Sequence, residues 1–146
     1  MNETAATLQG ARTPWHLWVV GILVLLWNGS GAYTILMAQA GNWPGISPDE
    51  AAYYADQPLW FVALTDVALF APIAGGVALL LRRRWAVPLF AVGLVAVGLA
   101  DVWDLAAGTS RALANAGAAI VTACIFVIAV LELLYARAMR SRGVLR

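Results

Sequence analysis

The chain has 146 residues, of which 62% are hydrophobic and 12% charged, and its formal net charge is +1. Soluble domains carry about 25% charged residues, and a soluble chain this apolar would expose large adhesive patches, so lipid is the more natural solvent. The small net charge excludes a global attraction to nucleic acid, and the length suits one compact unit, a single domain over residues 1–146.

Four long apolar segments follow one another along the chain, and each exceeds the roughly 20 residues that a helix needs to cross a bilayer. None shows the alternating pattern of a membrane β-barrel strand. Because lipid offers the backbone no hydrogen bonds, each segment must be a helix. The sequence therefore predicts an all-α integral membrane four-helix bundle, with helices at about 15–37, 59–81, 85–107 and 112–135.

The arginines are divided unequally between the two sides of the predicted bundle, and the chain contains no lysine. An even number of spans places both termini on one side. That side would hold Arg12, the arginines at 82–84 and those at 137–146, whereas the other would hold only Arg111. This asymmetry predicts cytoplasmic N and C termini and a multi-pass protein of the bacterial inner membrane.

The first outer loop, residues 39–58, is the one long connection and would lie in the periplasm. Its Ser-Pro-Asp-Glu motif at 47–50 has the pattern of a capping box with proline at the first helical position. The motif predicts a short amphipathic helix over 48–56, and Tyr53 and Tyr54 would let this helix lie flat at the membrane surface. The loop is either an ordinary connector or a lid.

Only three residues, Arg82, Arg83 and Arg84, separate the second and third apolar segments. So short a connection predicts a tight antiparallel hairpin. The glycine pair at 75–76, and Gly93 with Gly98 on the next helix, are expected to be notches where the helices pack closely.

Each predicted helix carries one polar side chain in the half nearer the outer surface. Ionisable residues within a span are costly, so each of them needs a structural or functional reason. At 1.5 Å per residue, Asp66 and Asp101 lie about 10 Å below that surface. Asn28 lies at a similar depth in the first helix, and Asn115 lies shallower in the fourth. These four residues are expected to form a polar interior in the outer half of the bundle.

Asp104 and Arg111 would lie at the mouth of this interior and pair with each other. Two carboxylates in a low-dielectric site cannot both be ionised unaided, so a proton, a cation or a partner's basic residue must balance Asp66 and Asp101. Three interpretations stay open: structural hydrogen bonds between helices, a third helix that ends near residue 99, and a solute, proton or ligand site. The candidate ligand or proton site comprises Asn28, Asp66, Asp101, Asp104, Asn115 and Arg111.

Other chemistry finds little support in the sequence. His16 is the only histidine and Cys124 the only cysteine, so one chain forms no bis-His haem site, zinc site or internal disulfide. There is no phosphate loop and no nucleophile elbow. We expect no catalytic residue, no metal and no enzymatic activity, and the sequence makes no prediction about a cofactor. Glu132, near the end of the fourth helix, is expected to pair with the arginine turn or with Arg137.

Four short segments carry a resemblance to other proteins. They are Leu-Leu-Trp-Asn-Gly at 25–29, Pro-Asp-Glu at 48–50 followed by Tyr53 and Tyr54, Pro-Leu-Trp-Phe-Val at 58–62, and Leu-Leu-Leu-Arg-Arg-Arg-Trp-Ala-Val-Pro at 79–88. Through these segments the chain resembles a group of small four-helix bacterial membrane proteins of unknown function, sometimes labelled sugar-transporter-like. The resemblance implies the fold and carries over no activity and no binding residue.

Two functions are compatible with these features. The first is a non-enzymatic accessory or helper subunit of a larger membrane complex, which the small size and the lack of a soluble domain favour. The alternative is a small-solute or proton-coupled carrier with a periplasm-facing acidic site. Because four helices enclose little volume, such a carrier would act as an oligomer. The expected partners are the lipid bilayer and either other membrane subunits or further copies of the chain, and not nucleic acid.

Overall fold

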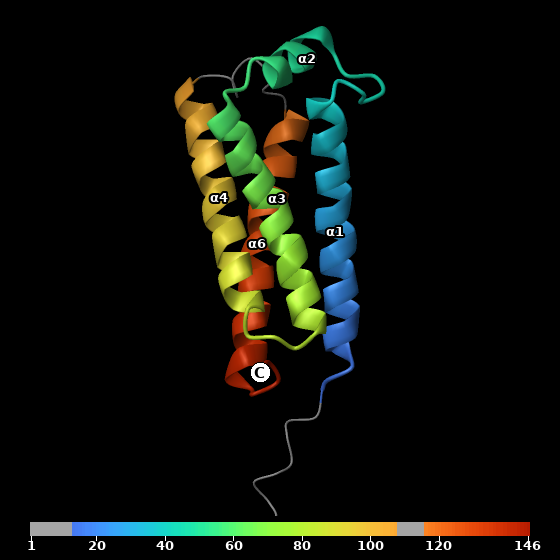
Figure 1. The fold of residues 1–146 in the computed structure, drawn as a ribbon, viewed down its shortest axis with the longest axis vertical. Helices are drawn as coiled ribbons and strands as arrows, with labels where there is room; N and C mark the ends of the chain where they lie inside the picture. The colour runs from blue at the N-terminus through green and yellow to red at the C-terminus, as the bar shows by residue number, and fades with distance from the viewer. Residues whose placement is uncertain (1–12, 108–115) are drawn as a thin grey trace, which may run out of the picture.

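A computed structural model describes residues 13–107 and 116–146. In chain order these residues form α1 (His16–Gln39), α2 (Pro48–Ala55), α3 (Leu59–Leu80), α4 (Ala86–Ala107) and α6 (Ala116–Ser141). The four long helices run side by side, and the short α2 lies across one end of them (Figure 1). No strand occurs within the described ranges, so the predicted all-α four-helix bundle is confirmed.

The four long helices are apolar enough to cross a membrane. Large apolar side chains point outward from the bundle; Leu23 and Leu26 of α1, for example, are 59% and 65% exposed. So much exposed apolar surface suits lipid rather than water as the surrounding medium. The chain is therefore a multi-pass integral membrane protein.

The predicted spans agree closely with the helices except at the end of α6. This helix continues to Ser141, whereas the apolar pattern predicted an end near residue 135. The added turns carry Arg137 and Arg140, whose side chains are exposed. The chain thus stays helical beyond its apolar segment, and Glu132 lies further from the helix end than expected.

The helices pack in the order α1, α3, α4, α6. The α3–α4 interface is the most extensive, as the short hairpin connection predicted, and α3 also packs on α1. The backbones of α1 and α6 make few close approaches. Two polar pairs cross this α1–α6 seam: Nδ1 of His16 lies 2.6 Å from the Tyr135 hydroxyl, and Nδ2 of Asn28 donates to Oε1 of Glu132 over 2.7 Å.

Glycines bring α1, α3 and α4 close together. A Cβ atom at Gly93 would lie 2.7 Å from Cγ of Pro72, and one at Gly75 would lie 3.0 Å from the ring of Phe90. A Cβ at Gly76 would meet a side chain of α1 at 2.9 Å. Small residues at such positions allow the close helix approach that packing in lipid requires. The predicted notches at 75–76 and 93 are confirmed. The one predicted at Gly98 is wrong, because a Cβ there would meet its nearest neighbour, Phe126, at 3.5 Å, an ordinary contact.

Three helices end in the same backbone motif. The residue after each C-cap has a positive φ, which is 68° at Gly41, 55° at Arg82 and 70° at Gly143. In each case the amide of this residue and the next one bond back to carbonyls of the last turn, as in a Schellman motif. Arg82 thus occupies a position where the other two helices have glycine.

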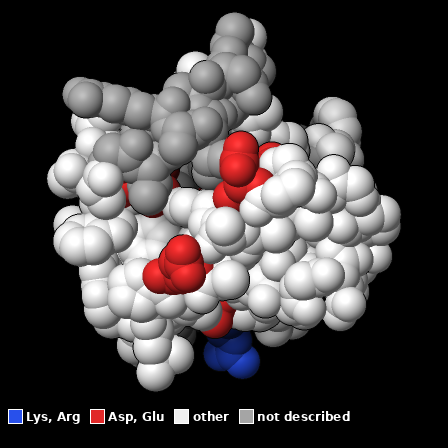
Figure 2. Space-filling model, turned by 90° about the horizontal axis from the view of Figure 1, so that it is seen from above, with Lys and Arg blue, Asp and Glu red and all other residues white. Residues whose placement is uncertain are grey.

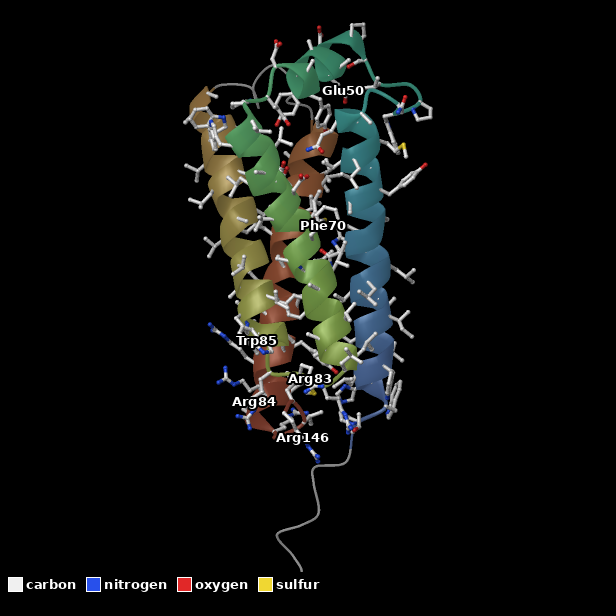
Figure 3. The ribbon with its side chains drawn as sticks, in the orientation of Figure 1. Glu50, Phe70, Arg83, Arg84, Trp85 and Arg146 are labelled. Carbon is white, nitrogen blue, oxygen red and sulfur yellow. The ribbon has the colours of Figure 1, made fainter. Side chains whose placement is uncertain are left out.

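The two ends of the bundle differ in charge and in packing. Figure 3 shows Arg83, Arg84 and Arg146 at one end, here called the arginine end, and Glu50 of α2 at the other, here called the α2 end. The buried apolar cluster is centred toward the arginine end, where the C-terminal residues fold back onto the helices. Its members are Leu17, Val24, Ala78, Leu79, Ala86, Val87, Phe90, Leu133, Ala136, Met139, Val144 and Leu145.

Candidate ligand cavity

A cavity of about 410 Å³ lies between the helices in the half of the bundle next to α2. Its wall runs from Trp27 to Gln39 along α1 and from Gly93 to Asp104 along α4, about 18 Å and about 16 Å of helix at 1.5 Å per residue. Residues of α2, α3 and α6 complete the wall, most of which is apolar. This volume falls within the range of about 300–1,000 Å³ that is typical of small-molecule sites.

The deepest polar group of the cavity is a carboxamide–carboxylate pair. Glu132 is only 6% exposed, and its Oε1 atom accepts a hydrogen bond from Nδ2 of Asn28 over 2.7 Å. The same nitrogen donates to the carbonyl of Val24 in its own helix over 2.9 Å. Within the described parts of the chain, the second carboxylate oxygen of Glu132 accepts no hydrogen bond.

The expected pairing of Glu132 with the arginine turn or with Arg137 is wrong. Because α6 continues for nine residues beyond Glu132, the side chain lies about 14 Å from the helix end at 1.5 Å per residue. It therefore meets the middle of α1 rather than the basic residues of the arginine end.

Asp101 lines the cavity from α4, closer to the α2 end. Its Oδ2 atom is buried and has no hydrogen-bond partner among the described residues. The same holds for Nε2 of Gln39 and Oε1 of Gln57, which also line the cavity. A buried polar atom without a partner costs about 1–3 kcal/mol. These three atoms can therefore bond to the polar groups of a bound molecule.

The position of Asp101 decides one of the open alternatives. A third span ending near residue 99 would have left this aspartate in the outer loop. Helix α4 instead continues to Ala107, so Asp101 lies within the helix and faces the interior of the bundle.

Helix α2 covers the α2 end of the cavity. It begins at the predicted capping box, in which the Ser47 hydroxyl accepts from the Glu50 amide and the Glu50 carboxylate accepts from the Ser47 amide. The Glu50 carboxylate accepts a hydrogen bond from the Ser47 amide and another from the Ser47 hydroxyl, over 2.8 Å, and these two bonds hold the pKa of Glu50 below its usual value. Figure 2 shows Asp and Glu side chains on this end of the bundle, among mostly uncharged residues, with basic side-chain atoms visible at the lower edge of the view.

The tyrosines of α2 line the cavity instead of lying flat against lipid. The hydroxyl of Tyr53 donates to both carboxylate oxygens of Asp104, over 3.1 and 3.0 Å. Burial, and then the negative charge of Asp104, raises the pKa of Tyr53. The phenol thus keeps its proton and joins α2 to α4. This contact makes α2 a cover for the cavity and gives the lid interpretation a structural basis.

Of the predicted site residues, the cavity brings together Asn28, Asp101 and Asp104. Asn115 and Arg111 lie outside the described residues, so the pairing of Asp104 with Arg111 stays a prediction.

Asp66 lies on a different face of its helix. The α3 residues in the cavity wall are Thr65, Ala68, Leu69 and Pro72, which follow a helical i, i+3, i+4, i+7 spacing. Asp66 falls outside this face, and its buried Oδ1 atom has no hydrogen-bond partner among the described residues. It shares a depth with the cavity but does not line it.

Glu132 is the one carboxylate among the described cavity residues that the sequence pattern did not predict as part of the site. Two sequence signals point to it. The first is Gly143, which follows the end of α6 and has a positive φ. A helix that continues to this glycine, and does not end where the apolar segment stops near residue 135, places Glu132 well inside the bundle. Ile125, Ile128, Ala129 and Glu132 also share a helical face by their spacing, and all four line the cavity.

The fold and the cavity together define a multi-pass membrane protein with a pocket between its helices. No protein-family model matches the chain, and neither a curated protein nor a solved structure matches it.

Proposed function

We propose that the protein binds a small amphipathic molecule in this cavity and acts as a small-solute carrier of the bacterial inner membrane. The observation that carries the proposal is the cavity itself. Its wall is largely apolar, and the buried polar atoms of Gln39, Gln57 and Asp101 have no partner among the described residues. An apolar pocket with a few convergent polar groups is the usual composition of a ligand site.

The arginine asymmetry supports an orientation in which the arginine end faces the cytoplasm. The mouth under α2 would then face the periplasm. The buried cluster of apolar residues lies toward the opposite end of the bundle. Release to the cytoplasm would therefore require the helices to rearrange, or a second copy of the chain to complete the pathway.

Two glycines of α1 supply a matched test of binding. A Cβ atom would meet nothing within 4 Å at either Gly29 or Gly31, but only Gly31 lines the cavity. Gly31→Phe should fill the cavity, whereas Gly29→Phe adds the same side chain outside it. Small molecules extracted from the purified proteins would be compared by mass spectrometry. We expect a compound that co-purifies with the wild type and with Gly29→Phe but not with Gly31→Phe. Identical extracts from all three proteins would contradict the proposal.

A second candidate function, an accessory subunit of a membrane complex, has a separate observation in its favour. Residues 119–125 of α6 are all exposed, over almost two turns of helix, and of these seven residues only Val121 and Ile125 line the cavity. A neighbouring membrane subunit would have access to the faces of this segment that point away from the cavity. Purification in a mild detergent tests this function: a stable complex with other membrane proteins would support it, and a homogeneous preparation of this chain alone would not.

A further inference from the structure

The charges on the cavity wall indicate which amphipathic molecules it would accept, and this inference rests on the function proposed above. The described wall residues include Asp101, Asp104 and Glu132, and no Arg, Lys or His. A buried carboxylate is stable in low-dielectric surroundings when it is hydrogen-bonded and paired with an opposite charge. Asn28 supplies Glu132 with a hydrogen bond but no charge.

We propose that the cavity binds a lipophilic organic cation, with Glu132 as the counter-charge at its deep end and Asp101 as a second anionic contact nearer α2. Glu132 is almost completely buried, yet one of its oxygens remains without a partner among the described residues. The oxygen that Asn28 does not bond is therefore available to a cationic group. The apolar wall above it provides the surface for the hydrophobic part of the ligand.

The arrangement of the acids favours a bulky organic ion over a metal ion. The described residues contain no group of three or more His, Cys, Asp or Glu side chains that could hold a metal. The carboxylates are instead spread along the cavity. The wall also contains Trp27, Tyr53 and Tyr54, and aromatic faces attract organic cations. Separated carboxylates and aromatic rings together are suited to a cation whose charge is surrounded by hydrocarbon.

Tetraphenylphosphonium and tetraphenylborate form a suitable pair of probes, because they share a shape and carry opposite charges. Binding of each ion to the full chain in detergent would be measured by equilibrium dialysis, with protein-free micelles as the blank. We expect saturable binding of the phosphonium and none of the borate. Gly31→Phe should abolish this binding and Gly29→Phe should retain it.

Glu132→Gln tests the counter-charge, since the amide oxygen can still accept from Asn28. The loss of a buried charge-assisted contact should weaken phosphonium binding by about tenfold or more. Asp66→Asn removes a carboxylate from a span without touching the cavity wall and should leave binding unchanged. Circular dichroism and gel filtration would establish that each variant folds, so that a loss of binding reflects the site.

The outcomes separate this inference from the function on which it rests. Equal binding of both ions, or phosphonium binding that survives in folded Glu132→Gln, would overturn the inference. If triphenylphosphine oxide, a neutral probe, binds the wild type but not Gly31→Phe while the phosphonium fails to bind, the cation inference is overturned and the ligand-binding function stands. If none of the three probes binds, both are overturned.

Discussion

The ring of Pro72 in α3 occupies the space that a side chain at Gly93 of α4 would need. A Cβ atom there would lie 2.7 Å from Cγ and 2.8 Å from Cδ of the proline. A pyrrolidine ring cannot turn aside as a flexible side chain does, because it is bonded to its own backbone at both ends. The approach of α3 to α4 at this point therefore depends on the glycine.

Gly93→Ala should lower the free energy of unfolding by about 1–3 kcal/mol, the usual cost of overpacking a core. A control lies on the same helix: a Cβ at Gly98 would meet its nearest neighbour, Phe126, at 3.5 Å, which is ordinary contact. Gly98→Ala should be neutral or slightly stabilising, since alanine favours the helix. Thermal melts of the two variants in the same detergent give the comparison, and equal stability would argue against the Pro72 contact.

The hydrogen bond between Asn28 and Glu132 should appear as a coupling energy across the α1–α6 seam. In a double-mutant cycle with Asn28→Ala and Glu132→Ala, we expect about 0.6–1.7 kcal/mol, the range of interhelical hydrogen bonds in membranes. Among the described residues, the Thr34 hydroxyl bonds only to the carbonyl of Ser30 in its own helix, so a cycle of Thr34→Val with Glu132→Ala should show additivity. Additivity in both cycles would mean that the seam pair does not form.

Arg82 and Gly143 occupy the same position of one backbone motif, and substitutions there should change the free energy of unfolding in opposite directions. A non-glycine residue in the left-handed region costs about 1–2 kcal/mol. Arg82→Gly should therefore raise the free energy of unfolding by about 1 kcal/mol, reduced by the loss of the Arg82–Thr13 hydrogen bond. Gly143→Ala should lower it by a similar amount, about 1 kcal/mol. Both are measured by denaturant titration in detergent; a destabilised Arg82→Gly variant would show that the arginine side chain outweighs its backbone strain.

The raised pKa of Tyr53 predicts how α2 responds to alkaline pH. The folded state holds the phenolic proton more tightly than the unfolded state, so the stabilisation is complete below the ordinary tyrosine pKa of about 10 and is lost as pH rises beyond it. Tyrosinate absorbance should show a late-titrating component in the wild type from Tyr53 and from Tyr54, whose pKa burial also raises. The part due to Tyr53 should disappear in Tyr53→Phe and move to lower pH in Asp104→Asn. A titration of Tyr53 that Asp104→Asn leaves unchanged would place Tyr53 away from Asp104.

Local sequence signals predicted the fold well, and the partners of buried polar residues poorly. The Ser47–Glu50 capping box acts within four residues, so its pattern alone placed α2. Depth along a helix is equally local, which is why Asp66 and Asp101 were placed at one level. The depth of a residue does not determine in which direction its side chain points around the helix axis. Asp66 lies on a face of α3 that does not line the cavity. The partner of Glu132 lies 104 positions away, and no local pattern identifies it.

The α1–α6 seam also bears on the order in which the chain is assembled. Its two polar pairs join residues 104 and 119 positions apart, so α1 enters the membrane long before α6 is made. During that interval Asn28 has no Glu132 to bond. Its hydrogen bond to the Val24 carbonyl, one turn away in α1, satisfies part of the amide within the helix, where lipid provides no other partner. Helix α1 can thus insert into the bilayer with Asn28 partly hydrogen-bonded, before α6 is present to supply Glu132.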